Sequence, residues 1–447
     1  MTEHRLLRAH RPGSIVAWRA GAPVVVETFL YDVAALAALL PARGHVVNLC
    51  RDRYRFAVGF AAALSRRQLT LLPPHDGAAM LDQLAADYPD VYHLVDAAPA
   101  KGPSVFRYPD ALTHDASSPA VPSFPADQPA AVLFTSGSTG RPQPHARSWG
   151  TLVTSTLAAG QRLGVAAMAG ASVLGTVPHQ HSYGLECLLM LPLQHGLALH
   201  AGRPFYPADI VAELTASARP RVLVTTPVHL RVLLAEAGEL PPVDLLLSAT
   251  APLPMTLAQE AEARFSATLL EIYGCSEAGQ IAVRRTALAE DWRCLDGIEM
   301  RQDAAGTWVS GVPIAAETLL SDTIRLLGPG RFVLEGRSVD MVNIAGKRTS
   351  LAHLNHHLNA IPGVLDGVFV ATEGEGDAAH RLTAFVVAPG MTADEILSAL
   401  RRRIDATFLP RPLHLVGELP RNMLGKLPRE AVMRQLTERR LAMAREA

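Results

Sequence analysis

The residues best suited to chemistry follow an apolar run in the first third of the chain. The run AAVLF at 130–134 leads directly into Thr135, Ser136, Gly137, Ser138, Thr139 and Gly140. Glycine permits backbone conformations that aim successive N–H groups at one point, and the hydroxyls add donors for anionic oxygens. The segment therefore predicts a phosphate-binding loop, although an ordinary turn has a similar composition and the segment does not carry the GxxxxGK[ST] pattern of P-loop NTPases.

Three later segments carry charged groups that could serve a nucleotide. Glu277 lies in a small-residue loop after a predicted strand, where a carboxylate could hold Mg²⁺ against phosphate oxygens. Asp322 and Arg337 offer a carboxylate for sugar hydroxyls and a cation beside it, yet each could equally belong to a surface ion pair. Lys426 follows a glycine near the C-terminus, where its mobile charge could reach reacting oxygens.

The elements that must position these segments read as an α/β fold. Between residues 24 and 72, helix-like apolar spacing alternates with short β-branched runs. The later runs ASVLGTV, PRVLVTT and VDLLLSA are separated by segments long enough for the crossover helices of a parallel sheet. The chain has 447 residues, more than one hydrophobic core usually serves, and its C-terminal part reads as a smaller α+β unit.

In this order and at these separations, the four segments resemble the core motifs of the adenylate-forming superfamily, which comprises acyl-CoA synthetases, peptide-synthetase adenylation domains and luciferases. The resemblance covers nearly all of the chain. It implies an α/β fold with a large multi-sheet N-terminal domain, residues 1–337, that binds ATP and the acid. A small, mobile α+β lid domain, residues 338–447, is expected to follow.

The resemblance also implies roles for residues at matched positions. The loop at 135–140 should cradle phosphates, Glu277 should bind Mg²⁺, and Asp322 and Arg337 should hold the ribose. Lys426 should bridge the acid and ATP, and the loop at Gly346 should turn towards the incoming thiol. Further nucleotide contacts are expected from Thr250, Tyr273, Gly274 and Ser276, of which Ser276 should face the α-phosphate.

The segment PHQHSYGLE resembles the family's PxxHxxG motif, which places His181 and Tyr183 beside the acyl tunnel. His181 therefore joins Glu277 and Lys426 as an expected catalytic residue, although a core histidine bonded to backbone groups is an open alternative. Two positions depart from the family pattern. Gln143 stands where a loop lysine is usual, and Val339 stands where the hinge usually has Asp or Lys.

The substrate expectation depends on two longer stretches, SGSTGRPQPHARSW and AGKRTSLAHLNHHLNAIPGV. They look most like the ligases of xanthomonadin and aryl polyene pigment pathways. This resemblance implies an aromatic acid such as 3- or 4-hydroxybenzoate, activated with ATP and Mg²⁺ and passed to coenzyme A or the phosphopantetheine thiol of an acyl carrier protein. A medium- or long-chain acyl-CoA synthetase, a non-catalytic adenylate- or acyl-binding relative and luciferase-like oxidation stay open as alternatives.

Composition argues against several other functions. Lys plus Arg number 41 against 42 for Asp plus Glu, so neither a nucleic-acid surface nor a polybasic membrane anchor is expected. Apolar runs fall short of the ~20 residues that span a bilayer, and the four separated cysteines fit a reducing cytoplasm better than a disulfide framework. His353, His356 and His357 could bind zinc only with further ligands, and Cys275 reads as a packing residue.

Overall fold

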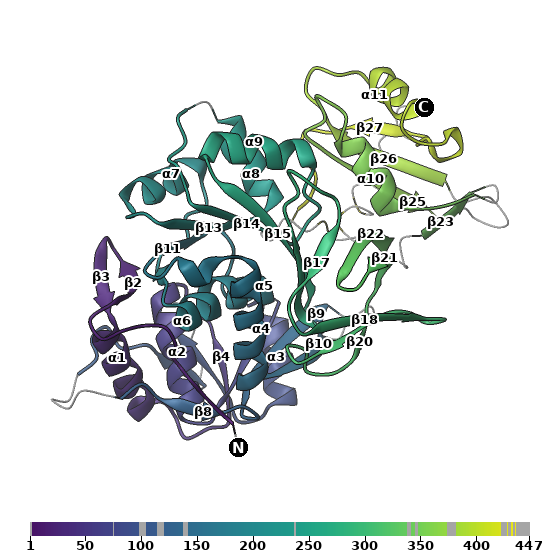
Figure 1. Cartoon of the computed structure of the whole chain (residues 1–447). Helices are drawn as coiled ribbons and strands as arrows, with labels where there is room; N and C mark the ends of the chain where they lie inside the picture. Colours follow the sequence, from purple (N-terminus) through teal and green to yellow (C-terminus); the bar gives the residue numbers. More distant parts are fainter. Residues whose placement is uncertain are drawn as a thin grey trace.

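The computed structural model describes residues 2–74, 76–97, 104–113, 120–136, 142–236, 238–337, 341–344, 347–372 and 381–421, together with 427, 431 and 434. Two large sheets and their helices form most of the molecule, and a smaller group of elements from the last part of the chain lies at its upper right in Figure 1. The predicted fold class, an α/β protein with a large multi-sheet part and a smaller C-terminal part, is confirmed.

The first large sheet has six strands in the order β10-β9-β5-β4-β6-β7, and all neighbours are parallel except β9 and β10. Its strands are β4 (His45–Asn48), β5 (Leu69–Leu72), β6 (Val91–Val95), β7 (Val105–Arg107), β9 (Pro129–Ser136) and β10 (Pro142–Ser148). Val46 packs into one hydrophobic cluster and its neighbour Val47 into another, because successive side chains of a strand point to opposite faces. Both faces are therefore covered, which explains the nearly continuous apolar runs of these strands.

The second large sheet has eleven strands, and its six central strands, β2-β12-β11-β13-β14-β15, are parallel. In spatial order the strands are β21 (Asp322–Gly328), β22 (Arg331–Arg337), β17 (Trp292–Cys294), β16 (Gly279–Arg284), β15 (Thr268–Cys275), β14 (Leu245–Ser248), β13 (Arg221–Thr225), β11 (Ser172–Gly175), β12 (Ala198–His200), β2 (Ile15–Arg19) and β3 (Ala22–Val25). The predicted runs ASVLGTV, PRVLVTT and VDLLLSA contain β11, β13 and β14.

Helices separate and cover the two sheets. The described helices of this part are α1 (Val26–Leu39), α2 (Arg53–Ser65), α3 (Ala78–Asp87), α4 (Trp149–Arg162), α5 (Ser182–Gly184), α6 (Leu191–His195), α7 (Pro207–Ala216), α8 (Pro227–Ala235) and α9 (Met255–Phe265), with a 3₁₀ turn at Val165–Ala167. Residues of α4 pack into the clusters of both sheets, so α4 lies between them. Helices α7, α8 and α9 cover the other face of the eleven-stranded sheet, whereas α3 covers the outer face of the six-stranded sheet.

A π-helical segment, Leu185–Met190, joins α5 to α6. Smaller sheets complete the large part: β1 (Glu3–Arg5) pairs with β8 (Ser123–Pro125), and β18 (Ile298–Asp303), β19 (Gly306–Gly311) and β20 (Thr318–Leu319) form a three-stranded sheet. Wider π turns inside helices occur frequently at functional sites, and this one begins at Leu185, in the last two residues of the PHQHSYGLE segment that contains His181.

The C-terminal elements have a hydrophobic cluster of their own, which includes Val342, Leu354, Phe369 and Ile396. They are β23 (Met341–Ile344), β24 (Lys347–Ser350), α10 (Leu351–Asn359), β25 (Asp366–Thr372), β26 (Arg381–Val387), α11 (Ala393–Arg401), a 3₁₀ turn at Ala406–Phe408 and β27 (Leu413–Leu415). A separate core favours the predicted division into two domains, and the boundary at residue 337 stays a prediction.

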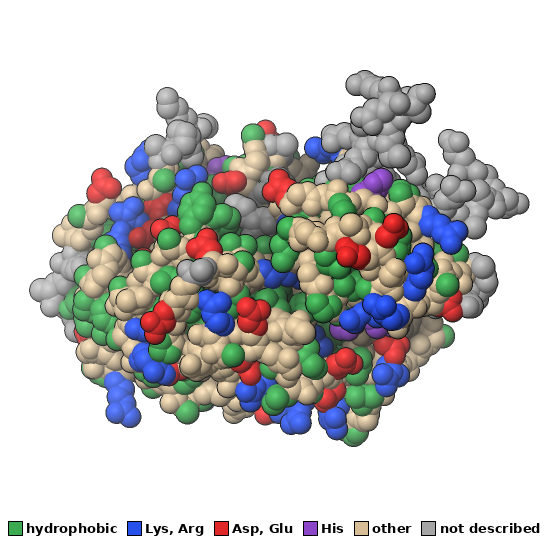
Figure 2. Space-filling model, turned by 90° about the horizontal axis from the view of Figure 1, so that it is seen from above, with side chains coloured by type: hydrophobic (Ala, Val, Ile, Leu, Met, Phe, Trp, Pro, Cys, Tyr) green, Lys and Arg blue, Asp and Glu red, His purple; other side chains and the backbone are tan. Residues whose placement is uncertain are grey.

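The part of the chain that the structure describes contains no helix long and apolar enough to cross a bilayer. On the face seen in Figure 2, acidic and basic side chains are interspersed over the surface. The described residues also contain no group of three His, Cys, Asp or Glu side chains that could hold a metal ion. The ring centroids of His353 and His357 lie 4.5 Å apart, but the described residues supply no third ligand beside them.

Candidate functional site

Four of the predicted site residues lie at the end of β15 and in the turn to β16: Tyr273 and Gly274 in the strand, and Ser276 and Glu277 in the turn. The two strands approach so closely that a Cβ atom on Gly274 would lie 2.3 Å from the carbonyl oxygen of Gly279. Gly279 itself has a φ of +84°, which glycine adopts without strain. The sequence thus forms a tight turn at the carboxyl end of a central strand, where open α/β sheets bind ligands.

The other large sheet presents β10 to this turn. Gln143, His145 and Arg147 lie two residues apart on β10, so their side chains share one face. Arg147 Nη2 donates a hydrogen bond of 2.5 Å to the carbonyl oxygen of Ser276, and His145 Nε2 lies 3.9 Å from Glu277 Oε1. The strand that follows the phosphate-loop sequence therefore packs directly beside the proposed metal ligand.

The electrostatics of this contact distinguish its groups. Burial lowers the pKa of His145, which Glu277 partly opposes and Arg147 reinforces. His145 is therefore largely uncharged at neutral pH, so Arg147 is the one permanent cation among the three polar side chains on this face of β10. The side chain of Glu277 is 44% exposed, which leaves its carboxylate accessible for a ligand.

The predicted phosphate loop connects β9 to β10 in the sequence. Thr135 pairs with Gln143 and Ser136 pairs with Pro142, so the two strands form an antiparallel ladder up to the ends of this segment. The structure describes Thr135 and Ser136 by their backbone, and Gly137, Ser138, Thr139 and Gly140 lie outside the described residues. The phosphate-binding role of 135–140 stays a prediction.

The predicted ribose pair is brought together by a β-hairpin. Asp322 and Arg337 are directly opposite each other in the ladder of β21 and β22. The hydroxyl of Tyr273 donates a hydrogen bond of 2.7 Å to Asp322 Oδ2, and the tyrosine ring packs 5.6 Å from the rings of Trp292 and Phe332. The hairpin and β15 therefore place three predicted nucleotide residues side by side.

Thr250 has an unusual backbone conformation. It follows β14 with a φ of +80°, in the left-handed region that a β-branched residue adopts at a cost of about 1–2 kcal/mol. Such outliers cluster at ligand-binding sites, and Thr250 lies just past the carboxyl end of the strand next to β15. The strain supports its prediction as a site residue.

A sequence model of the family described as AMP-binding enzyme matches residues 17–313, about two thirds of the chain. The chain belongs to the AMP-binding enzymes. Among curated relatives of this AMP-binding enzyme, a 4-coumarate–CoA ligase of Rhodobacter capsulatus is 32% identical over 300 residues, which are 66% of this chain and 74% of the relative. A 3-hydroxybenzoate–CoA/4-hydroxybenzoate–CoA ligase of Thauera aromatica is 26% identical over 383 residues, 76% of this chain and 72% of the relative.

The fold of this AMP-binding enzyme is similar to folds seen in solved structures. The crystal structure of ATP-bound MatB from Rhodopseudomonas palustris superposes with a TM-score of 0.81 at 19% identity, covering 95% of this chain and 96% of the other. The likeness therefore extends through the C-terminal elements, beyond the region that the family model matches. The predicted adenylate-forming type of fold is confirmed, whereas the likeness to the pigment-pathway subgroup stays a prediction.

The histidines of the PHQHSYGLE motif have different surroundings. His181 directly precedes α5, and its carbonyl oxygen accepts a hydrogen bond of 2.7 Å from the N–H of Leu185. His179 is the buried one: its Nε2 lies 2.9 Å from the carbonyl oxygen of Cys50, and burial lowers its pKa to about 3. Tyr183 donates to the carbonyl oxygen of Thr225 at 3.2 Å, so its hydroxyl helps to dock the helix on β13.

Two buried charges of the AMP-binding enzyme received no role in the sequence analysis. Glu186, in the π-helical segment, is 5% exposed, and Arg147, on β10, is 4% exposed. Glu186 interrupts the otherwise apolar run that follows the PxxHxxG-like motif, and a charged residue in such a run was the available signal. Lys426, Gly346 and Val339 lie outside the described residues, so their expected roles stay predictions.

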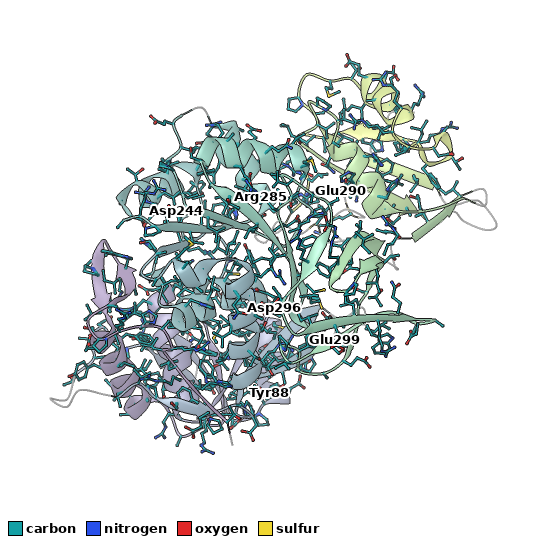
Figure 3. All side chains as sticks on the ribbon, in the orientation of Figure 1. Tyr88, Asp244, Arg285, Glu290, Asp296 and Glu299 are labelled. Carbon is teal, nitrogen blue, oxygen red and sulfur yellow. The ribbon has the colours of Figure 1, made fainter. Side chains whose placement is uncertain are left out.

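A hollow of about 650 Å³ lies at the amino ends of β14 and β15. Figure 3 labels Asp244 and Arg285, two of its lining residues. Its arginines are already paired with acids, Arg219 with Asp244 at 2.5 Å and Arg285 with Glu262 at 2.9 Å. The hollow is thus internally neutralised and lies at the opposite end of the strands from the predicted site.

Proposed function

We propose that this AMP-binding enzyme is an ATP-dependent acid–thiol ligase that forms an acyl adenylate and then a thioester. One observation supports this function above the others: the turn that contains Ser276 and Glu277 packs against the polar face of β10, immediately after the phosphate-loop sequence. A carboxylate and backbone groups therefore converge, with a buried guanidinium behind them, where a nucleoside triphosphate would bring its phosphates.

The residues present fit such a nucleotide. The close approach of Gly274 and Gly279 leaves no room for side chains inside the turn, so its backbone can face a phosphate. Glu277 would hold Mg²⁺ through its exposed carboxylate, and oxygen ligands are those that this ion prefers. Bound Mg²⁺ would neutralise charge on the phosphates. Asp322 and Arg337 would hold the ribose, with Tyr273 orienting the aspartate through its hydrogen bond.

In the first half-reaction, a carboxylate oxygen of the acid attacks the α-phosphorus of ATP, and the bond to the bridging oxygen breaks so that pyrophosphate leaves. The protein must align the nucleophile and stabilise the growing charge. Ser276 and Lys426 would act at the α-phosphate and the attacking carboxylate. In the second half-reaction, a thiol loses its proton, its sulfur attacks the acyl carbon, and AMP leaves.

For the acid, we propose an aromatic carboxylate such as 3- or 4-hydroxybenzoate. The named relatives from R. capsulatus and T. aromatica act on 4-coumarate and on hydroxybenzoates, and they support this class. The acceptor is coenzyme A or an acyl carrier protein, with the carrier protein favoured by the pigment-pathway resemblance. Movement of residues 338–447 about a hinge near Val339 would alternate the two half-reactions.

The test is acid-dependent exchange of pyrophosphate into ATP, measured with purified protein and Mg²⁺ across hydroxybenzoates, cinnamates and short to long fatty acids. Exchange with the aromatic acids is expected, and Lys426→Ala should abolish it while leaving ATP binding intact. Exchange with fatty acids alone would contradict the aromatic substrate and favour a medium- or long-chain acyl-CoA synthetase. If no acid of the panel supports pyrophosphate exchange, a non-catalytic binding protein is favoured.

A further inference from the structure

We infer that Glu186 and Arg147, two buried side chains of opposite charge, lie against the β15–β16 turn from different elements and position it for the nucleotide. Both are positioning residues, since they act through Ser276 and Glu277. The inference rests on the proposed function for its catalytic consequence, and it concerns side chains that the family motifs do not include.

Arg147 is the centre of the arrangement. Arg147 is 4% exposed, and its Nη2 donates to the Ser276 carbonyl oxygen at 2.5 Å. Burial lowers the pKa of Arg147, and the nearby Glu186 carboxyl opposes this more strongly than Cys275 or Glu277 does. A buried cation needs compensating partners, and a cation this enclosed cannot itself reach into solvent for a ligand. Arg147 therefore supports the turn from behind.

Glu186 provides the compensating charge from the helical layer between the two sheets. It is 5% exposed, and Ser182 Oγ donates to its Oε1 at 3.1 Å. Burial raises the pKa of the Glu186 carboxyl, and Arg147 is the strongest influence in the opposite direction. The carboxylate also lies against the turn: a Cβ on Gly279 would be 3.4 Å from Glu186 Oε1. Glycine at 279 thus leaves space for the carboxylate.

The consequence is that residues of three layers lie against the same turn. Glu186 belongs to the π-helical segment, Arg147 to the six-stranded sheet, and Ser276 to the eleven-stranded sheet. The position of Glu277 relative to the phosphate-loop sequence therefore depends on two opposite charges that are buried on different sides of the turn.

The chain offers a matched control for loss of a buried carboxylate. Glu271 is 4% exposed, burial raises its pKa, and it accepts hydrogen bonds of 2.7 Å from Arg284 and from Thr286. It lies on β15, the strand that leads into the turn, but four residues before Cys275 and paired with Arg284 on β16. Glu271→Gln therefore removes the same charge from another buried position, next to the same turn, and leaves Glu186 and Arg147 unchanged.

The experiment compares Glu186→Gln, Arg147→Lys, Arg147→Met and Glu271→Gln with the wild type. The affinity for ATP with Mg²⁺ is measured by calorimetry, kcat and KM by pyrophosphate exchange, and Tm by thermal unfolding. We expect Glu186→Gln to weaken Mg·ATP binding about tenfold and to lower the exchange kcat about 10- to 100-fold, with the KM for the acid unchanged. Arg147→Lys, which keeps the charge, should retain more of both than Arg147→Met does.

The outcomes separate the inference from the proposed function. If Glu186→Gln binds Mg·ATP and exchanges pyrophosphate as well as Glu271→Gln at matched Tm, the inference is overturned and the ligase proposal stands. If the wild type activates no acid, the ligase proposal fails, and the calorimetric difference between Glu186→Gln and Glu271→Gln still decides the positioning role. A wild type that binds no Mg·ATP overturns both.

Discussion

Substitution of Gly274 by alanine tests the geometry of the β15–β16 turn most directly. The added Cβ would lie 2.3 Å from the carbonyl oxygen of Gly279 and 3.0 Å from the Cα of Gln280. Carbon and carbonyl oxygen in favourable contact are about 3.3–3.6 Å apart, so the strands must separate by about 1 Å. The atoms in the way belong to the backbone, so a change of side-chain rotamer cannot relieve the contact.

Two magnitudes follow from this displacement. Overpacking at a well-packed site costs about 1–3 kcal/mol of the free energy of unfolding. A shift of about 1 Å in groups that position a substrate lowers the reaction rate about 100-fold, equivalent to about 2.7 kcal/mol in the activation free energy. Gly274→Ala should therefore remain folded at 25 °C but lose about 99% of its pyrophosphate exchange, since Ser276 and Glu277 move with the turn.

The assay measures exchange and thermal unfolding of Gly274→Ala beside Gly238→Ala. Gly238 is the matched control, because a Cβ there would meet no atom of the described residues within 4 Å and its φ is not in the left-handed region. Gly238→Ala should keep wild-type exchange. If Gly274→Ala exchanges pyrophosphate within threefold of Gly238→Ala, the turn does not control the site and our reasoning on its geometry is wrong.

Three further predictions concern charge. Asp366 accepts bonds of 2.6 and 2.7 Å from Arg421 and lies 3.6 Å from Arg231 of α8, so Asp366→Asn should loosen the contact of the C-terminal elements with α8 and slow adenylate formation about fivefold. The rate at which Asp366→Asn forms the thioester from preformed acyl adenylate serves as the control. If that rate falls as much as the rate of adenylate formation, the prediction is wrong. Gln143→Lys should speed exchange about fivefold by adding about 1 kcal/mol of attraction to pyrophosphate, and an unchanged rate would show that the lysine is dispensable. Burial lowers the pKa of His229 to about 4, below its unfolded value. Between pH 6.5 and 4 the unfolded state therefore binds a proton that the folded state does not. The free energy of unfolding decreases as the pH is lowered, by about 2 kcal/mol from pH 7 to pH 5. In urea unfolding, the free energy of unfolding should decrease less between pH 7 and pH 5 for His229→Gln than for the wild type. An equal decrease in both proteins would show that His229 is not the group responsible.

The fold class and the order of the site segments were predictable from the sequence because both depend on local patterns. Apolar runs such as VDLLLSA indicated strands buried on both faces, and this one contains β14. The segments around Asp322 and Arg337 predicted a pair, and the hairpin of β21 and β22 sets the two residues opposite each other. Hydrogen bonding between neighbouring strands makes such a pairing follow from a short stretch of sequence.

The Glu186–Arg147 arrangement was not predictable in the same way. In the sequence, Arg147 is one of several charged residues near the phosphate loop. Glu186 is the last residue of the PHQHSYGLE segment, and no role was predicted for it. Their approach to the β15–β16 turn depends on how two sheets pack around a shared layer of helices, which no local period encodes. The left-handed φ of Thr250 is likewise imposed by its surroundings, because a threonine alone disfavours it.

The sequence by itself therefore determined the chemical groups that this AMP-binding enzyme has available and the strands and turns that carry them. Only the tertiary structure decided which of those groups share a site: that Tyr273 bonds to Asp322, that His145 faces Glu277, and that a buried arginine holds the turn. The physical reason is that composition and periodicity act over a few residues, whereas burial, close backbone approach and charge compensation arise when distant layers pack together.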